Sequence, residues 1–331
     1  MSTTNNGNNL GQTYRKYIHT KSQDTAISVS ITINNMESTF LKLSPDVTLH
    51  ARISRPPIIN QKPLLIFLHY WGGSSSTWYK LTSPDSQTSL GTTYPILAVD
   101  LRGWGKSAGP TEETGTAYSI TAMASDVVIA LQQLKQDDST KDLFNHGFIL
   151  VGHSMGAKVA LATLSTLQES LLRKLRGLVL VAPAPPTTLR LPPDMKEQQK
   201  AAYETKESVR WTVENVLANP KSLSEDDIQL VIDDSLSANK LAKEAWPTYG
   251  MAEDVSERVR GSLAYISHAG VRVSVLVGGL DIVEPRERVE AEVCRFLEEN
   301  GVKTSLRVVE NVGHLIPLEC PEVICKEISL Y

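Results

Sequence analysis

"VGHSMGAKVA" (residues 151–160) carries the pattern Gly-x-Ser-x-Gly at the point where two kinds of sequence meet. The apolar run before it, "GFILVGH" (147–153), is typical of a buried strand, and "SMGAKVALATLSTLQ" (154–168) repeats small and apolar residues at helical spacing. A tight turn from strand to helix is the context that gives this pattern meaning, because it holds the serine hydroxyl above the sheet. We therefore predict that Ser154 is a nucleophile, placed where the helix N-terminus favours a developing negative charge.

Apolar runs of the same kind recur along the chain and alternate with helix-like segments. They are "LLIFLHY" (64–70), "YPILAVD" (94–100), "GFILVGH" (147–153), "GLVLVAP" (177–183) and "VRVSVLVGG" (271–279). Such continuous runs are typical of parallel strands covered on both faces, so the alternation predicts an α/β fold. Further strands are expected at 38–44, 47–54 and 303–310, the first two as an antiparallel pair, and further helices at 119–136, 286–299 and 320–329. The sheet would then have about eight strands.

One long segment interrupts this alternation. From the Pro-rich stretch "APAPPTTLRLPPD" (182–194) to about residue 262, the sequence is helix-like and charged, without a convincing strand. A separation of ~80 residues between two sheet strands exceeds a simple crossover, so we predict a helical insertion at 183–262. The core would comprise 26–182 and 263–331, and the polar, Asn-rich residues 1–25 are expected to be disordered.

Composition excludes several classes of function. The 331 residues are 41% hydrophobic, with a net charge of −4 and a pI near 6.0, which offers no basic surface for nucleic acid or anionic lipid. We see neither a signal peptide nor an apolar run of the ~18 residues needed for a membrane span. The cysteines (Cys294, Cys320 and Cys325) fit neither a disulfide framework nor a zinc site. These features predict a cytoplasmic location and say nothing of the oligomeric state.

Taken together, the chain resembles the α/β-hydrolase family from about residue 38 to 330, apart from the insertion. The resemblance implies a mostly parallel eight-stranded sheet, a helical cap between strands six and seven, and a catalytic triad in the chain order serine, acid, histidine. Of seven histidines, His314 matches the family's base, because it lies in a Gly-His loop between the last strand and helix. Asp281 in "VGGLDIVEP" (277–285) matches the acid, with Glu284 as its competitor, which is otherwise explained as a charge at a helix start.

The loop after the third strand carries a departure from the family. Members of the family commonly have the sequence His-Gly there, followed by a residue whose backbone N–H is one donor of the oxyanion hole. The second donor is the backbone N–H of the residue that follows the nucleophile. Aligned on His69, the donors here are Trp71 and Met155, and Tyr70 replaces the glycine. Because the donors are backbone groups, Tyr70 is compatible with the hole; its side chain either packs beneath the loop or points its hydroxyl into the pocket.

Other residues have weaker assignments. His69 and His153 lie at strand ends beside the predicted site and are interpreted as supporting or packing residues. Trp104 stands where the family often has histidine, in a loop whose Asp100 and Arg102 we interpret as structural. Large side chains of the insertion either line an apolar pocket or pack the cap: Met195, Tyr203, Trp211, Trp246, Tyr249 and Met251.

These residues predict a serine hydrolase that forms an acyl-enzyme with a small to medium, fairly apolar ester, lactone or thioester, without a metal or organic cofactor. Two alternatives stay open. One is a receptor-like protein that binds a small molecule and hydrolyses it slowly. The other uses the same residues to cleave a carbon–carbon bond next to a ketone or to form a peroxyacid. A purely structural protein is disfavoured by an intact triad in the correct order.

Overall fold

The computed structural model describes residues 36–56, 61–112 and 115–331. The segment 1–25, expected to be disordered, lies outside the described residues. The sheet has the order β1-β2-β4-β3-β5-β6-β7-β8; β2 is antiparallel to β1 and β4, and all other pairs are parallel. Its strands are β1 Glu37–Lys42, β2 Thr48–Ser54, β3 Leu64–Leu68, β4 Ile96–Val99, β5 Phe148–His153, β6 Leu175–Val181, β7 Arg272–Gly278 and β8 Thr304–Val309. The predicted mostly parallel, eight-stranded sheet is confirmed.

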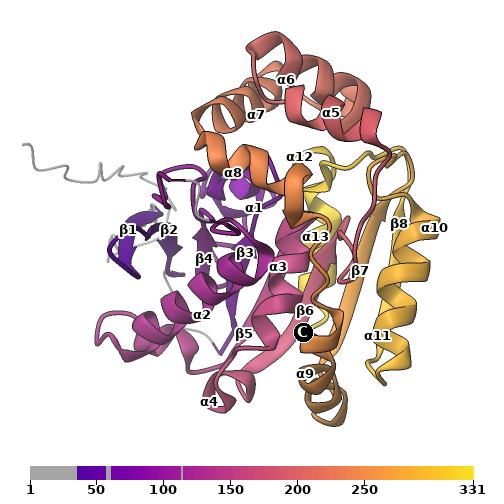
Figure 1. Cartoon of the computed structure of the whole chain (residues 1–331). Helices are drawn as coiled ribbons and strands as arrows, with labels where there is room; N and C mark the ends of the chain where they lie inside the picture. Colours follow the sequence, from indigo (N-terminus) through magenta and orange to yellow (C-terminus); the bar gives the residue numbers. More distant parts are fainter. Residues whose placement is uncertain (1–35, 57–60, 113–114) are drawn as a thin grey trace, which may run out of the picture.

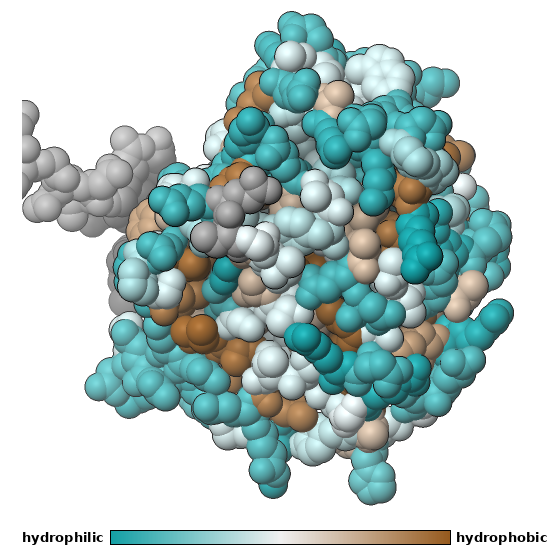
Figure 2. Space-filling model, in the orientation of Figure 1, coloured by the Kyte–Doolittle hydropathy of each residue, from teal (hydrophilic) through white to brown (hydrophobic). Residues whose placement is uncertain are grey.

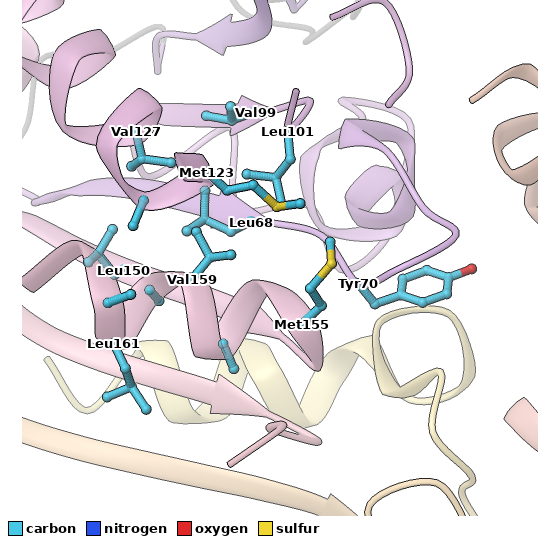
Figure 3. Packing of buried hydrophobic residues seen from close by; sticks show 14 of the residues in the cluster. Leu68, Tyr70, Val99, Leu101, Met123, Val127, Leu150, Met155, Val159 and Leu161 are labelled. Carbon is cyan, nitrogen blue, oxygen red and sulfur yellow. The ribbon is translucent and has the colours of Figure 1, made fainter. Parts of the chain in front are cut away.

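Helices cover both faces of this sheet, which explains its apolar strands (Figure 1). In β3, Leu64 and Ile66 pack in one hydrophobic cluster, while Leu65 and Phe67 pack in a second cluster on the opposite face. The first cluster includes residues of α2 Ile120–Gln136, α3 Met155–Leu164, α9 Ser256–His268 and α11 Arg295–Glu299. The second includes residues of α1 Tyr79–Thr82, α12 Ile316–Glu319 and α13 Pro321–Ile328. Figure 3 shows part of the first cluster, where Met123 and Val127 of α2 lie near Leu68 and Val159.

The segment between β6 and β7 forms a separate helical layer at one end of the sheet (Figure 1). It comprises α5 Pro193–Ala201, α6 Lys206–Thr212, the π-helical turn Val213–Leu217, α7 Glu225–Ser237, α8 Lys240–Ala245 and the π-helical turn Trp246–Gly250. We call residues 193–250 the cap. Helix α9 follows the cap and contacts α3 of the core. The division of the chain at 183 and 262 stays a prediction. Short elements elsewhere are α4 Glu169–Leu172 and α10 Arg286–Arg288.

A buried lysine joins the cap to the core. Lys158 lies on α3, has no exposed surface, and donates hydrogen bonds to the carbonyl oxygens of Thr187 (2.9 Å) and Met251 (3.2 Å). These two residues belong to the chain segments that lead into and out of the cap. The segments are also bonded directly, because the Leu189 N–H donates to the same Met251 carbonyl at 2.9 Å. Burial lowers the pKa of Lys158 to about 8, although surrounding carboxylates oppose the shift. One ammonium group therefore binds both chain segments that connect the cap to the core, and it belongs to α3, the helix that follows Ser154.

The visible surface in Figure 2 is mostly hydrophilic, with hydrophobic areas that are small and separate. None of the helices built from the described residues is both long and apolar enough to cross a lipid bilayer.

Candidate active site

Ser154 lies at the turn between β5 and α3, with φ 53° and ψ −115°. A non-glycine residue at positive φ carries backbone strain, which persists only where the surroundings enforce it. The surroundings here are close-packed: a Cβ on Gly152 would lie 2.5 Å from the Gly156 carbonyl oxygen, and a Cβ on Gly156 would lie 2.4 Å from that of Leu68. The two glycines therefore let the helix begin directly against the sheet, as the pattern predicts, and the turn holds the serine at the helix N-terminus.

His314 follows β8, in the loop that leads to α12, and it pairs with Asp281 from the loop after β7. The His314 Nδ1–H donates to Asp281 Oδ2 at 2.8 Å, and both side chains are buried. The other oxygen, Oδ1, accepts the backbone N–H groups of Val283 (2.8 Å) and Glu284 (2.9 Å), which fixes the carboxylate in place. Ser154 and His314 line the same cavity. The structure thus brings the three predicted triad residues together at one end of the sheet.

The charges around this pair affect its protonation. Burial by itself would lower the pKa of His314, but the charge of Asp281 and the hydrogen bond to it outweigh burial, so the pKa is raised above its usual value. Burial also raises the pKa of Glu284 to about 8, opposed by Arg288 and His314. Glu284 approaches the Arg288 guanidinium at 3.4 Å, whereas the imidazole is bonded to Asp281. Between the two candidate acids, the geometry favours Asp281.

We call residues 69–75, after β3, the β3 loop. The His69 Nδ1–H donates to the Tyr70 carbonyl at 2.7 Å, and the Gly73 N–H donates to the same oxygen at 3.1 Å. Because the C=O and N–H of a trans peptide point in opposite directions, these bonds direct the Trp71 N–H away from His69. Within the described residues, neither this N–H nor that of Met155 at the start of α3 donates a backbone hydrogen bond. Both groups suit the predicted oxyanion hole, which stays a prediction.

Tyr70 packs beneath the loop. Its ring centroid lies 4.9 Å from that of His153, and a Cβ on Gly73 would lie 2.6 Å from the ring. Figure 3 shows Tyr70 at the end of the hydrophobic cluster next to Met155, with its hydroxyl directed away from the cluster. Tyr70 lines the cavity, yet its hydroxyl is buried and makes no hydrogen bond within the described structure. Burial raises the pKa of Tyr70 well above 10. Of the two roles considered for this tyrosine, packing has the more direct support.

The remaining residues assigned to the site surroundings lie one layer deeper. His69, His153 and Trp104 are fully buried and are not among the residues that line the cavity. The His153 Nε2–H donates to the His314 carbonyl at 2.8 Å, and burial lowers the pKa of His153 well below its usual value. His69 accepts the Leu101 N–H at 3.0 Å, and burial lowers its pKa to about 4. Both imidazoles are therefore neutral and link neighbouring loops at this end of the sheet.

The cavity beneath the cap has a volume of about 370 Å³ and a mostly apolar wall. Its large side chains include both predicted tryptophans, Trp211 and Trp246. Three apolar residues at its mouth remain well exposed: Met195 (46%), Trp211 (50%) and Ile282 (65%). The other lining residues are Tyr70, Trp71, Ser154, Leu189, Leu191, Gln198, Gln199, Ala202, Tyr203, Thr212, Asn215, Val216, Leu217, Val283, Glu284, Arg288 and His314. Tyr249 and Met251 lie elsewhere, so they do not contribute to this wall.

Several contacts that bear on the site were not predicted from the sequence. The Glu319 carboxylate accepts the N–H groups of Gly313 (3.0 Å) and Leu315 (3.0 Å), which flank the predicted base. Ser235 and the Tyr203 hydroxyl contact the β3 loop from the cap. Neither contact could be inferred, because the partners lie more than 130 residues apart in the chain. No group of three or more His, Cys, Asp or Glu side chains within the described ranges is placed to hold a metal ion.

A mostly parallel sheet with a strained serine after its central strand, and a histidine–aspartate pair after its last two strands, defines a hydrolase of the α/β type. The chain belongs to the Alpha/beta hydrolase family, whose sequence profile matches residues 65–327.

Individual relatives are more distant. A probable lysophospholipase of Arabidopsis thaliana, BODYGUARD 1, is 30% identical over 119 residues, which are 36% of this chain and 23% of that protein. The chain thus spans less than a quarter of the length of the curated relatives it matches. Among solved structures, an esterase from Exiguobacterium antarcticum is similar with a TM-score of 0.69 at 22% identity, covering 89% of this chain and 99% of that one. A bromoperoxidase from Bacillus anthracis gives 0.68 at 16% identity, with the same coverage. At these identities the structures show the shared fold alone.

Proposed function

We propose that this protein is a serine hydrolase that cleaves an ester, lactone or thioester of a small to medium, fairly apolar substrate through an acyl-enzyme. The observation that carries the proposal is the joint placement of a strained Ser154 and of His314, paired with Asp281, in one cavity. A serine hydroxyl needs a base to take its proton, and the base needs a third group to orient it.

In the proposed reaction, His314 Nε2 takes the Ser154 hydroxyl proton as Oγ bonds to the acyl carbon. The N–H groups of Trp71 and Met155 stabilise the resulting oxyanion. His314 then gives its proton to the leaving oxygen or sulfur, and the bond to the leaving group breaks. A water that His314 deprotonates attacks the acyl-enzyme, so that the acid departs and Ser154 regains its proton. Asp281 holds the imidazole in the required tautomer and stabilises its protonated form.

The wall of the cavity supports an apolar substrate. Its apolar side chains surround the serine, and the exposed Met195, Trp211 and Ile282 extend the same character to the mouth. One relative's name refers to lysophospholipids, and one similar structure is an esterase. Monoacyl lipid esters therefore belong in the substrate screen beside short esters and lactones.

The test compares wild type with Ser154→Ala on p-nitrophenyl esters of short and medium chain length. Hydrolysis should fall to background in the variant, and a fluorophosphonate probe should label wild type on Ser154 only, as located by mass spectrometry. Ser125→Ala is the matched control, because its hydroxyl bonds a carbonyl within α2. Full activity in Ser154→Ala would refute the proposal. The turnover rate, together with ligand-dependent binding of a partner protein, distinguishes an enzyme from a receptor-like protein that hydrolyses its ligand slowly.

A further inference from the structure

We infer that the cap completes the oxyanion hole by holding the backbone of the β3 loop, with Tyr203 and Ser235 as positioning residues. The inference rests on the proposed function, because it concerns the orientation of the Trp71 N–H. It adds that the rate of acyl transfer depends on cap residues that need not touch the reacting atoms.

The first contact is a buried hydroxyl against a loop carbonyl. The Tyr203 hydroxyl, from the connection between α5 and α6, donates to the Trp71 carbonyl at 3.0 Å. The ring of Tyr203 also lies against the Trp71 indole, with centroids 4.3 Å apart. A Cβ on Gly72 would come within 2.5 Å of the Tyr203 hydroxyl, and Gly72 has φ +107°. The glycine at this position thus both permits the turn and makes room for the tyrosine.

Other cap segments hold the neighbouring groups of the same loop. The Ser235 hydroxyl, buried in α7, donates to the Gly72 carbonyl at 2.8 Å. The Ser74 hydroxyl donates to Asp234 at 2.8 Å, and the Trp71 indole N–H donates to the Lys243 carbonyl at 3.0 Å. Three separate parts of the cap therefore bind Trp71, Gly72 and Ser74 of the loop.

These contacts restrain the peptide unit between Trp71 and Gly72, to which the core makes none of the bonds described above. The core fixes the Tyr70 carbonyl through His69 and Gly73, which directs the adjoining Trp71 N–H. On the other side of Trp71, the carbonyl is held by Tyr203. Since two glycines follow, the loop would otherwise rotate readily about this peptide. Restraint on both sides of Trp71 keeps its N–H in one direction, which an oxyanion donor requires, because donors act through prior orientation.

The other parts of the site have independent restraints. Ser154 is held by the packed turn between β5 and α3, and Asp281 binds the imidazole from the core. The cap also touches the base loop, because the His314 N–H donates to the Leu217 carbonyl at 2.7 Å. Loss of the Tyr203 and Ser235 bonds should therefore weaken the stabilisation of the oxyanion. It should disturb the positions of the nucleophile Ser154 and of the base His314 less.

The experiment uses Tyr203→Phe, which removes one hydroxyl and keeps the ring. We expect kcat to fall about 10- to 100-fold, less than loss of a direct donor costs, while KM stays within about twofold. Affinity for a trifluoromethyl ketone, whose serine adduct carries an oxyanion, should fall by the same factor as kcat. Ser235→Ala should act in the same direction. Ser237→Ala is the control on the same helix, since its exposed hydroxyl bonds the Asp234 carbonyl, and it should leave all three quantities unchanged.

Wild-type kcat in both Tyr203→Phe and Ser235→Ala would overturn the inference. So would a change in KM alone, or a fall in kcat without a matching loss of ketone affinity. Thermal unfolding identifies a variant that fails to fold, in which case the other variant decides. If Ser154→Ala is inactive while both cap variants keep wild-type kcat, only this inference fails; if Ser154→Ala stays active, the proposed function fails.

Discussion

Within the described residues, two buried histidine–aspartate pairs use the same atoms at the same spacing. His314 Nδ1 lies 2.8 Å from Asp281 Oδ2, and His50 Nδ1 lies 2.7 Å from Asp100 Oδ2. The second pair even extends to a serine, because His50 Nε2 lies 3.1 Å from the Ser38 hydroxyl. A chain of hydrogen bonds from aspartate through histidine to serine is therefore not enough to define an active site.

The surroundings of the two pairs differ. Ser38 lies exposed on β1, an extended strand at the sheet edge, away from the cavity beneath the cap. Asp100 also accepts the backbone N–H groups of Ser75 (2.6 Å) and Lys106 (2.8 Å), so it joins the β3 loop to the loop after β4. Ser154 instead heads a helix at positive φ, beside unpaired N–H groups and a cavity. Helix position, anion donors and substrate space separate a candidate triad from a structural relay.

The largest expected effect is that of Asp281→Asn, which should lower kcat by about 10³- to 10⁴-fold because the amide no longer favours the required imidazole tautomer. Asp100→Asn is the matched variant in the other pair, and it should keep kcat within about tenfold of wild type. Steady-state kinetics on a p-nitrophenyl ester measures both. Equal losses of kcat in Asp281→Asn and Asp100→Asn would contradict the assignment of a catalytic role to the first pair and a structural role to the second.

Asp100→Asn should instead act on stability. Burial opposes ionisation, but the bonds from His50, Lys106 and Ser75 outweigh it and lower the pKa of Asp100 to about 2 from 3.8. Such a shift corresponds to roughly 2–3 kcal/mol of folding free energy. Because the pKa is lowered on folding, this contribution is complete above pH 3.8 and is lost as the pH falls toward 2. Urea unfolding of wild type and Asp100→Asn should differ most at pH 6, by about half as much near pH 3, and should converge only below about pH 2. A difference that does not change with pH would argue against this origin.

The pH profile of kcat/KM should report on His314, which must be neutral to accept the Ser154 proton. Since its pKa is raised, activity should rise with pH through a midpoint above the usual ~6.5. In Asp281→Asn, the negative charge that opposes the effect of burial on His314 is lost. The pKa of His314 should therefore fall, and the midpoint of the activity profile should move to lower pH. Glu284→Gln should cause a smaller shift in the same direction, because burial raises the pKa of Glu284 to about 8 and leaves it largely uncharged near neutral pH. Exposed Glu287→Gln should cause none; an equal shift there would rule out a specific effect.

The smallest effect belongs to Ser38→Ala. The hydroxyl is exposed and makes one bond to His50, so the free energy of unfolding should change by less than about 1 kcal/mol. Hydrolysis and fluorophosphonate labelling should match wild type. A fluorophosphonate adduct on Ser38 would show that the second relay also activates its serine.

Much of the fold followed from local sequence. Strands covered on both faces produce continuous apolar runs, so the positions of β3 to β7 were predicted closely, although "YPILAVD" (94–100) forms a strand only over Ile96–Val99. The helix expected at 286–299 is divided into α10, a π-helical turn and α11. Such an irregularity depends on packing against the sheet rather than on apolar spacing.

The site was predictable only in part. Ser154, Asp281 and His314 stand in motifs with a fixed order, and the structure places them together; their catalytic roles stay predictions. The His50–Asp100 pair carried no motif, because it forms only where β2 lies against β4. The hydrogen bond from Tyr203 to Trp71 likewise depends on how the cap packs against the loops at the end of the sheet. Contacts between distant segments follow from tertiary packing, which a single sequence does not reveal.

Lys158 has a consequence for engineering this fold. Its ammonium group binds one carbonyl from each of the two chain segments that connect the cap to the core. A cap transplanted from another member of the family would have to offer two carbonyl oxygens at that point, or leave a buried cation uncompensated. Exchange of substrate specificity by swapping caps is therefore constrained at the two splice sites, and replacing Lys158 with an apolar side chain of similar length is the natural first step before such a graft.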